Sequence, residues 1–331
     1  MAAAGKVVVV GSFNVDHVWR CTGLPVPGAT LAGEYTSGPG GKGFNQAVAA
    51  ARAGASTTFV CALGDDPGGG LARALAQADG IDLRAQRSDA PTGTAGIFVD
   101  AQGHNSIVIG AGANAALSPG FVAAQEDAIA AAGVVLAQLE SPVEAVMEAL
   151  RTARALGIRT ILNPAPANAE VPAPLLQLAD VLTPNETEFA ALLFRHLRAG
   201  VEPAAVATME DATLHAHCRA LLPDGTVVVT LGAAGCFVSH PGACRRGDMH
   251  DHYRVAPETA RAIDTTGAGD AFNGALAAAF AGDPLAGFVR HARFANCFGA
   301  LSTEIAGAAT AMPRLPELAA RFPIENGNGS H

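Results

Sequence analysis

Short apolar runs that end at glycine or at polar residues alternate along most of the chain with longer segments of helical spacing. The runs predict buried strands, and the spaced segments predict amphipathic helices. The predicted strands cover 6–11, 57–64, 134–139 and 159–162, and the predicted helices cover 45–52, 70–78, 121–131 and 143–156. This alternation predicts a three-layer, doubly wound α/β fold with a mainly parallel sheet and helices on both faces.

Two early segments do not follow this alternation. Residues 14–37 are polar and interrupted by turn signals, and residues 92–110 contain a hairpin pattern of two alternating runs around a polar turn. We expect them to form a small β-sheet that projects from the main domain as a lid. The chain is then a single domain over 1–324, followed by a polar tail over 325–331 that we expect to be disordered.

Composition narrows the function classes. Half of the 331 residues are hydrophobic, and the formal net charge of -9 disfavours nonspecific binding to nucleic acid or to an anionic membrane. Every apolar stretch is interrupted before it reaches membrane-spanning length, and the first residues lack a signal-peptide pattern. The six cysteines are scattered without a C-x-x-C pair, as expected for reduced thiols. These features predict a cytoplasmic protein.

The first glycine-rich loop is ambiguous. Residues Gly38 to Gly43 match G-x-G-x-x-G, a weak signal for a dinucleotide in a nicotinamide-dependent oxidoreductase. An earlier strand already ends at Gly11, and Lys42 lies inside the loop, so the dinucleotide pattern is out of place. The segment does not match a P-loop either, because Gly43 stands where a P-loop has a hydroxyl residue that would hold magnesium. A tight turn made by glycines is the other interpretation.

The second loop carries more chemistry. Asp264 to Asp270 precedes a predicted helix over 271–281. The backbone amides of Gly267, Ala268 and Gly269 are expected at the helix N-terminus, where they and the helix dipole favour an anion such as phosphate. An acid beside an anion site is costly unless it has a task, so we interpret Asp270 as the base that accepts a proton from an attacking hydroxyl. A helix cap is the alternative.

Several motifs in order along the chain resemble those of the PfkB family of sugar kinases, and within it the members that phosphorylate ribose. The second loop with Ala271 to Leu276 resembles the family's C-terminal signature, and Gly40 to Gly43 with Asn45 resembles its N-terminal signature. The further matching segments are 11–17, 112–119, 138–142, 163–167 and 183–188. The resemblance implies the fold described above and ATP-dependent phosphorylation of a primary hydroxyl, with ribose as the favoured acceptor.

The resemblance also implies roles for individual residues. The positions that match sugar-binding residues are Asn14, Asp16, Gly41, Lys42, Gly43, Asn45, Glu140 and Asp270. The positions that match the nucleotide side are Asn185, Glu188, Thr230, Gly232, Gly235, Gly269 and Asn296. Within the second set, Asn185 and Glu188 match an N-x-x-E motif that organises Mg²⁺ beside the phosphates. Asn185 and Glu188 also suit a helix N-cap and first turn. Lys42 and the backbone amides of residues 267–269 would neutralise negative charge during phosphoryl transfer.

A monovalent cation site follows from the same resemblance. Asp264 matches an aspartate that binds K⁺ together with backbone carbonyls, here those of Thr266, Ser302, Ile305 and Gly307. Ala311 departs from the pattern, because a serine hydroxyl is a ligand in those relatives. The alternative is that Asp264 bonds only loop amides. A homodimer formed through the lid is also expected.

Other interpretations remain open. The acceptor could be deoxyribose, fructose or a nucleoside, and a non-catalytic sugar-binding regulator is a third class beside the kinase and the oxidoreductase. Segments 194–209 and 247–258 are longer than the resemblance predicts. The histidines of 215–217 and 250–252 lack the helical spacing of a metal pair, so we expect them on the surface or in loops. Trp19 and Phe13 are equally compatible with ligand contact and with packing.

Overall fold

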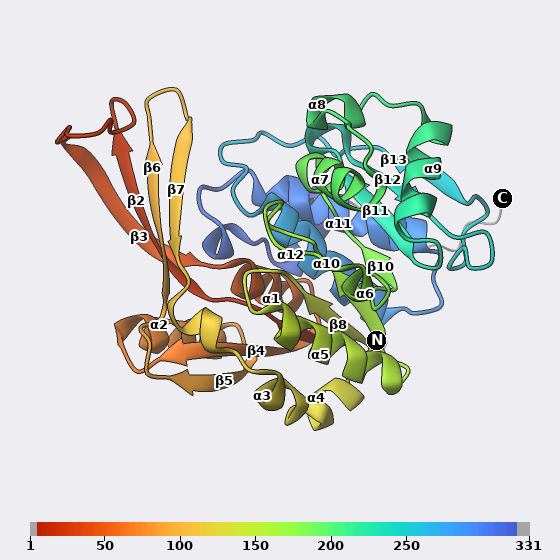
Figure 1. Ribbon diagram of the computed structural model, residues 1–331, viewed down its shortest axis with the longest axis horizontal. Helices are drawn as coiled ribbons and strands as arrows, with labels where there is room; N and C mark the ends of the chain where they lie inside the picture. The colour runs from red at the N-terminus through yellow and green to blue at the C-terminus, as the bar shows by residue number, and fades with distance from the viewer. Residues whose placement is uncertain (1–4, 323–331) are drawn as a thin grey trace.

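In the computed structural model, which describes residues 5–322, the strands form two separate sheets (Figure 1). The large sheet has nine strands in the order β13-β12-β11-β10-β9-β8-β1-β4-β5. All neighbours in it pair in parallel except β11 with β12 and β12 with β13. The strands are β1 Lys6–Val10, β4 Ser56–Gly64, β5 Asp82–Ser88, β8 Val134–Ala137, β9 Arg159–Leu162, β10 Val181–Leu182, β11 Thr226–Thr230, β12 Cys236–Ser239 and β13 His252–Val255.

Helices cover both faces of this sheet, as the sequence predicts. Alternate residues of β1 point to opposite faces, so Val7 and Val9 join one buried apolar cluster and Val8 and Val10 join the other. The first face carries α1 Lys42–Arg52, α2 Pro67–Ala78, α10 Ala268–Gly282, α11 Phe288–Ser302 and α12 Leu315–Arg321. The second carries α3 Pro119–Ala123, α4 Glu126–Ala130, α5 Val143–Ala155, α6 Ala173–Leu176, α7 Glu186–Leu197, α8 Pro203–Val206 and α9 Asp211–Leu221.

Short 3₁₀ turns complete the main domain: η1 Gly112–Ala116, η2 Gly232–Ala234 and η3 Ala309–Ala311. Across residues 5–322, no helix has both the length and the apolar character needed to cross a membrane. The expected tail over 325–331 lies outside the described residues.

One predicted helix is wrong in its extent. The segment 121–131 forms two short helices, α3 and α4, and the first begins at Pro119 after the N-cap Ser118. The chain turns between them at Gln125, whose side-chain amide donates to the Phe121 carbonyl over 3.1 Å. The Gln125 backbone amide bonds instead to Val122, three residues earlier, so the α-helical ladder is interrupted.

The small sheet lies apart from the large one and extends away from it in Figure 1. Its order is β3-β2-β6-β7, with β2 Asn14–Cys21, β3 Gly33–Gly40, β6 Gly93–Val99 and β7 Asn105–Gly110. Trp19 lies between Tyr35 and Phe98, with ring centroids 5.2 and 5.3 Å away. Phe13 instead is fully buried in the main core, 5.1 Å from the Phe44 ring. Trp19 and Phe13 therefore both pack against protein side chains.

The contact between α1 and α10 prepares the site. Gly274 faces α1, and a Cβ atom at this position would lie 2.4 Å from the Gln46 carbonyl oxygen. Because glycine has no Cβ, the two backbones approach more closely than any other residue would permit. This approach brings Asn45 and Gln46 of α1 within hydrogen-bonding distance of Asp270 on α10.

Candidate active site

A pocket lies at the carboxyl ends of the parallel strands, beside the first turn of α10. Asn163 follows β9, Thr183 follows β10 and Thr230 ends β11, and all three line it. The other lining residues are Lys42, Ala165, Asn185, Glu188, Gly267, Gly269, Asp270 and Asn273. Open α/β sheets bind their ligands at this end of the strands, so the topology itself indicates where the chemistry occurs.

Helix α10 begins earlier than the sequence predicts. Its N-cap is Gly267, in the left-handed conformation with φ 76°, and Ala268, Gly269 and Asp270 form the first turn. Amides in a first turn have no partner within the helix, so they favour a bound anion. One predicted donor differs, because the Ala268 amide already donates to the Thr265 carbonyl over 3.2 Å. Anion binding at the start of α10 would therefore depend mainly on the amides of Gly267 and Gly269.

Asp270 is buried, and its carboxylate accepts two side-chain hydrogen bonds. Asn45 Nδ2 donates to Oδ2 over 2.9 Å, and Gln46 Nε2 donates to Oδ1 over 2.9 Å. Burial raises the pKa of Asp270, although the charge of Lys42 and these two carboxamide bonds oppose the rise. A carboxylate with a raised pKa, held in one orientation beside an anion site, suits a general base.

Gln46 belongs to a network that the sequence analysis did not identify. Its Nε2 also donates to Asn163 Oδ1 over 3.0 Å, and its Oε1 accepts a 2.5 Å bond from Gln138 Nε2. These bonds fix which end of the carboxamide faces Asp270, since only the amino end can donate. The one signal in the sequence is that Gln46 follows Asn45 in the helix, and nothing there indicates its partners.

Lys42 is the first residue of α1 and lines the pocket near Asp270. Burial alone lowers the pKa of a lysine, but the charges of Asp270, Glu140 and Glu188 outweigh burial and raise it. Lys42 is therefore an ammonium ion at neutral pH. The preceding residue, Gly41, has φ 87° and starts the helix in a conformation that favours glycine.

Among the predicted sugar-side residues, Asn14 and Asp16 lie in β2 of the small sheet, and Glu140 follows β8 of the large one. Asn14 Oδ1 accepts a 2.8 Å bond from Asn114 Nδ2. One oxygen of Glu140 accepts bonds from the Ser12 hydroxyl over 2.6 Å and from the Lys42 backbone amide over 2.9 Å. Neither Ser12 nor Asn114 was among the predicted site residues. Their contacts hold the side chains of Glu140 and Asn14 in place.

Asp16 carries the most unusual electrostatics of this group. Burial, with the charges of Glu140 and Asp270 added to it, raises the pKa of Asp16 to about 7. Gly40 lies against it, since a Cβ there would be 2.1 Å from Asp16 Oδ2. The neighbouring negative charges destabilise the ionised form of Asp16, and hydroxyl donors on a ligand would relieve that cost.

The predicted nucleotide-side residues lie on several different elements. Asn185 is the N-cap of α7 and forms a reciprocal capping box with Glu188, each side chain bonding the other's backbone amide over 2.8 and 2.9 Å. Thr230 ends β11, and Gly232 and Gly235 frame η2 with positive φ angles of 51° and 82°. Burial raises the pKa of Glu188, partly offset by its bond from the Asn185 amide and by the charge of Lys42.

Asn296 and the segment 247–258 meet on this side. Asn296 Nδ2 donates to the carbonyls of Val255 and Ala256 over 3.3 and 3.2 Å. The amide of Asn296 therefore holds the end of β13. In segment 194–209, the other one that is longer than the resemblance predicts, α7 ends at Leu197 and α8 follows at Pro203–Val206.

Asp264 accepts hydrogen bonds from two loop amides. Its Oδ1 accepts from the Thr266 amide over 2.9 Å, and Oδ2 accepts from the Gly307 amide over 3.0 Å. Burial raises its pKa, but the bonds from Thr266 and Gly307 outweigh burial and lower it, so the group is ionised. The Ser302 hydroxyl donates to the Gly299 carbonyl, and Ile305 is exposed. The ionised carboxylate of Asp264 is thus available to a cation near the backbone amides at the start of α10.

Comparisons with known proteins agree on one family. A family model described as pfkB family carbohydrate kinase matches residues 4–315. The ribokinase of Haemophilus influenzae is 38% identical over 94% of this chain and 96% of its own. The bifunctional ribokinase/ribose-5-phosphate isomerase A of Fructilactobacillus sanfranciscensis is 40% identical over 93% of this chain, which spans 54% of that protein. The structure of Arabidopsis thaliana ribokinase complexed with ribose and ATP matches with a TM-score of 0.77 and 29% identity, covering 97% of this chain and 98% of its own.

Proposed function

The chain belongs to the pfkB family of carbohydrate kinases and is a ribokinase-type phosphotransferase, and from this premise we propose that it phosphorylates D-ribose. The reaction transfers the γ-phosphate of ATP to the primary hydroxyl, giving D-ribose 5-phosphate and ADP. The observation that carries the proposal is the position of Asp270, a buried carboxylate held by two carboxamides in the first turn of α10.

In the proposed mechanism, Asp270 accepts the proton of the attacking hydroxyl while its oxygen forms a bond to the γ-phosphorus. The bond between that phosphorus and the β–γ bridging oxygen breaks, and ADP leaves. Phosphoryl transfer depends mainly on positioning and charge neutralisation. The amides of Gly267 and Gly269 and the Lys42 ammonium supply the positive potential.

Asp16, Asn14 and Glu140 would hold the sugar hydroxyls. Carboxylates accept from hydroxyls, and the carboxamide of Asn14 can donate as well as accept. A pair of acids and an amide suits an acceptor with several adjacent hydroxyls, which favours ribose over deoxyribose. Fructose and nucleosides are the remaining acceptors to compare.

Glu188 and Asn185 would organise Mg²⁺ and its waters beside the phosphates. Both line the pocket, and the donor set of carboxylate and carboxamide oxygens fits a hard cation. The ion would neutralise charge on the phosphates. For K⁺, Asp264 supplies a carboxylate near carbonyls of Thr266, Ser302, Ile305 and Gly307, and this site remains a prediction.

The nicotinamide alternative lacks support from the fold. The segment from Gly38 to Gly43 runs from the end of β3 in the small sheet into the start of α1, whereas a dinucleotide fingerprint follows a strand of the parallel sheet. Retention of a buried acid at position 270 argues against a non-catalytic regulator.

We expect a homodimer through the small sheet, which would also act as a lid. Tyr35, Ile107, Val108 and Ile109 are at least half exposed on it, and apolar surface of this kind favours a protein contact. Light scattering on the purified chain measures the oligomeric state. Replacing Ile107 and Ile109 with Ser should yield a monomer, and an unchanged mass would contradict the contact.

The central experiment measures ADP release with MgATP and a panel of ribose, deoxyribose, fructose and nucleosides. Ribose should give the largest kcat/KM, and ³¹P NMR should identify a phosphate ester on the primary hydroxyl. Asp270→Asn should lower kcat about a hundredfold or more with ATP binding retained. Asp283→Asn, the same change at the exposed far end of α10, is the matched control. Near-normal kcat in Asp270→Asn would contradict the assigned base.

A further inference from the structure

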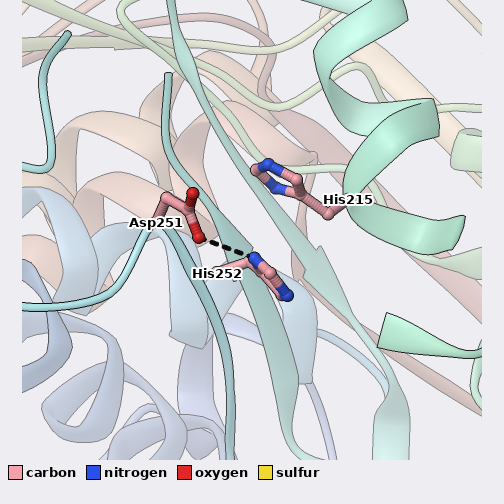
Figure 2. A group of neighbouring side chains, drawn as sticks. All are labelled: His215, Asp251 and His252. Carbon is pink, nitrogen blue, oxygen red and sulfur yellow. Dashed lines mark hydrogen bonds and ion pairs between the residues drawn. The ribbon is translucent and has the colours of Figure 1, made fainter. Parts of the chain in front are cut away.

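A cluster of His215, Asp251 and His252 lies outside the proposed active site (Figure 2). His215 belongs to α9, Asp251 immediately precedes β13, and His252 is the first residue of that strand. One nitrogen of each imidazole and one carboxylate oxygen lie within 4.8 Å of one another. All three side chains are partly exposed, so solvent ions reach them.

The sequence expectation for these histidines was incomplete. Spacing along the chain gave no metal pair, because the two imidazoles come from different elements separated by β11 and β12. Packing of α9 on the edge of the sheet brings them face to face, with ring centroids 4.4 Å apart and an interplanar angle of 24°. The separation in sequence is therefore no guide to the separation in space.

The Nδ1 atom of each imidazole takes part in a hydrogen bond. His215 Nδ1 lies 2.8 Å from the Ser239 hydroxyl, and His252 Nδ1 lies 2.7 Å from Asp251 Oδ1. Ser239 and His252 are direct partners across β12 and β13. The contact with Ser239 is of the kind that orients an imidazole ligand in a metal site, and the contact between His252 and Asp251 already brings two of the three side chains together.

The present arrangement needs one adjustment to hold an ion. Stacked rings do not aim their lone pairs at a common point, so one imidazole must rotate when a metal enters. With bonds of about 2.1 Å, tetrahedral ligand atoms are about 3.4 Å apart, so the cluster must contract by about 1.4 Å at most. Partial exposure of both rings leaves room for that rotation.

Charges around the cluster are mixed. Arg219 Nε donates to the Ser239 hydroxyl over 3.0 Å, which places a positive group nearby. Asp251 supplies the opposing negative charge. Burial, the neighbouring His252 and Arg219 lower the pKa of His215, with Asp251 opposing them, so the imidazole is neutral at pH 7 and free to bind a cation.

We propose that His215, Asp251 and His252 bind one divalent transition-metal ion of the class represented by Zn²⁺, with water completing a tetrahedral site. Two imidazoles and a carboxylate match the ligand preference of Zn²⁺ and do not suit Mg²⁺ or Ca²⁺. The ion joins α9 to β13, the edge strand of the large sheet. It therefore stabilises this edge.

The site is separate from catalysis. Ser239 pairs with Val227 near the start of β11, whereas Thr230, which lines the catalytic pocket, pairs with Cys236. The cluster thus lies toward the opposite end of β11 and β12 from the pocket. The proposal is independent of the kinase chemistry, and variants here should leave kcat with MgATP unchanged.

The test titrates ZnCl₂ into the full chain, freed of any affinity tag and treated with chelator, in the absence of ATP. A Cys244→Ser background removes the exposed thiol, which would otherwise compete for zinc. Calorimetry should give one site, and saturation at about 100 times Kd should raise Tm by about 4 °C. His215→Ala and His252→Ala should each abolish the shift, whereas the neighbouring His217→Ala and His250→Ala should retain it.

Several outcomes overturn the proposal: no stoichiometric binding, an equal shift from MgCl₂, or binding that survives the double variant of His215 and His252. If His215→Ala does not fold, as judged by circular dichroism, His252→Gln decides the result, and retained zinc binding there rejects the site.

Discussion

Replacing Gln46 with Met tests how the proposed base is held. Gln46 is fully buried, and its carboxamide is bonded at every side to Asp270, Asn163 and Gln138. Met has similar length and no donor, so the variant removes one of the two side-chain bonds to the Asp270 carboxylate. Asn45 remains as the other donor.

The magnitude follows from the lost bond. A hydrogen bond to a charged group contributes about 1.5–3 kcal/mol, and one pKa unit corresponds to about 1.36 kcal/mol. The bond from Gln46 stabilises the ionised form, so its loss raises the pKa of Asp270 further. The acidic limb of the kcat/KM profile should therefore move up by about one to two pH units, and the deficit should shrink as pH rises.

The assay is initial-rate ADP release across a pH series, with Tm measured on the same samples. Loss of partners for Asn163 and Gln138 costs about 1–3 kcal/mol per group, so Tm should fall as well. Gln125→Met is the matched control, because Gln125 is a buried glutamine near α4 that makes no contact with the site. A folded Gln46→Met enzyme with the wild-type pH profile would refute the reasoning, since the bond would then have no influence on the base.

Three further predictions concern charge and packing. Asp16→Asn should raise Tm relative to wild type near pH 8 but not near pH 4, because the raised pKa of Asp16 in the folded state makes its ionisation costly as pH rises from about 4 to 7. The same variant should raise the KM for ribose, and equal Tm differences at both pH values would contradict the pKa shift. K⁺ should activate more than Na⁺ at constant ionic strength, and Asp264→Ala should lose the difference; equal rates with both ions and with a bulky organic cation would exclude the site. Gly274→Ala should push α1 from α10 because its Cβ meets the Gln46 carbonyl at 2.4 Å, costing about 1–3 kcal/mol in urea denaturation and lowering kcat; wild-type stability would show that the helices adjust freely.

The sequence by itself determined the layers of the fold and predicted Asp270 as the central residue of the candidate site. Valine runs predicted the parallel strands, because strands buried on both faces are apolar throughout, and apolar residues at helical spacing predicted the helices. The small sheet was predicted from segments that lack both patterns. Asp270 was predicted as the base because an acid directly after glycines at the start of a helix is costly beside an anion site, and this pattern is visible in the local sequence.

Only the tertiary structure decided the contacts between distant segments. Gln46 meets Asp270, Asn163 and Gln138 because α1 and α10 approach closely on one face of the sheet, and no local pattern encodes a partner 224 positions away. The division of 121–131 into two helices likewise depends on side-chain bonds of Gln125. His215 and His252 meet across a helix and an edge strand. Hydrogen-bond partners and ligand clusters depend on side-chain positions in three dimensions, whereas periodicity reports only which face is buried.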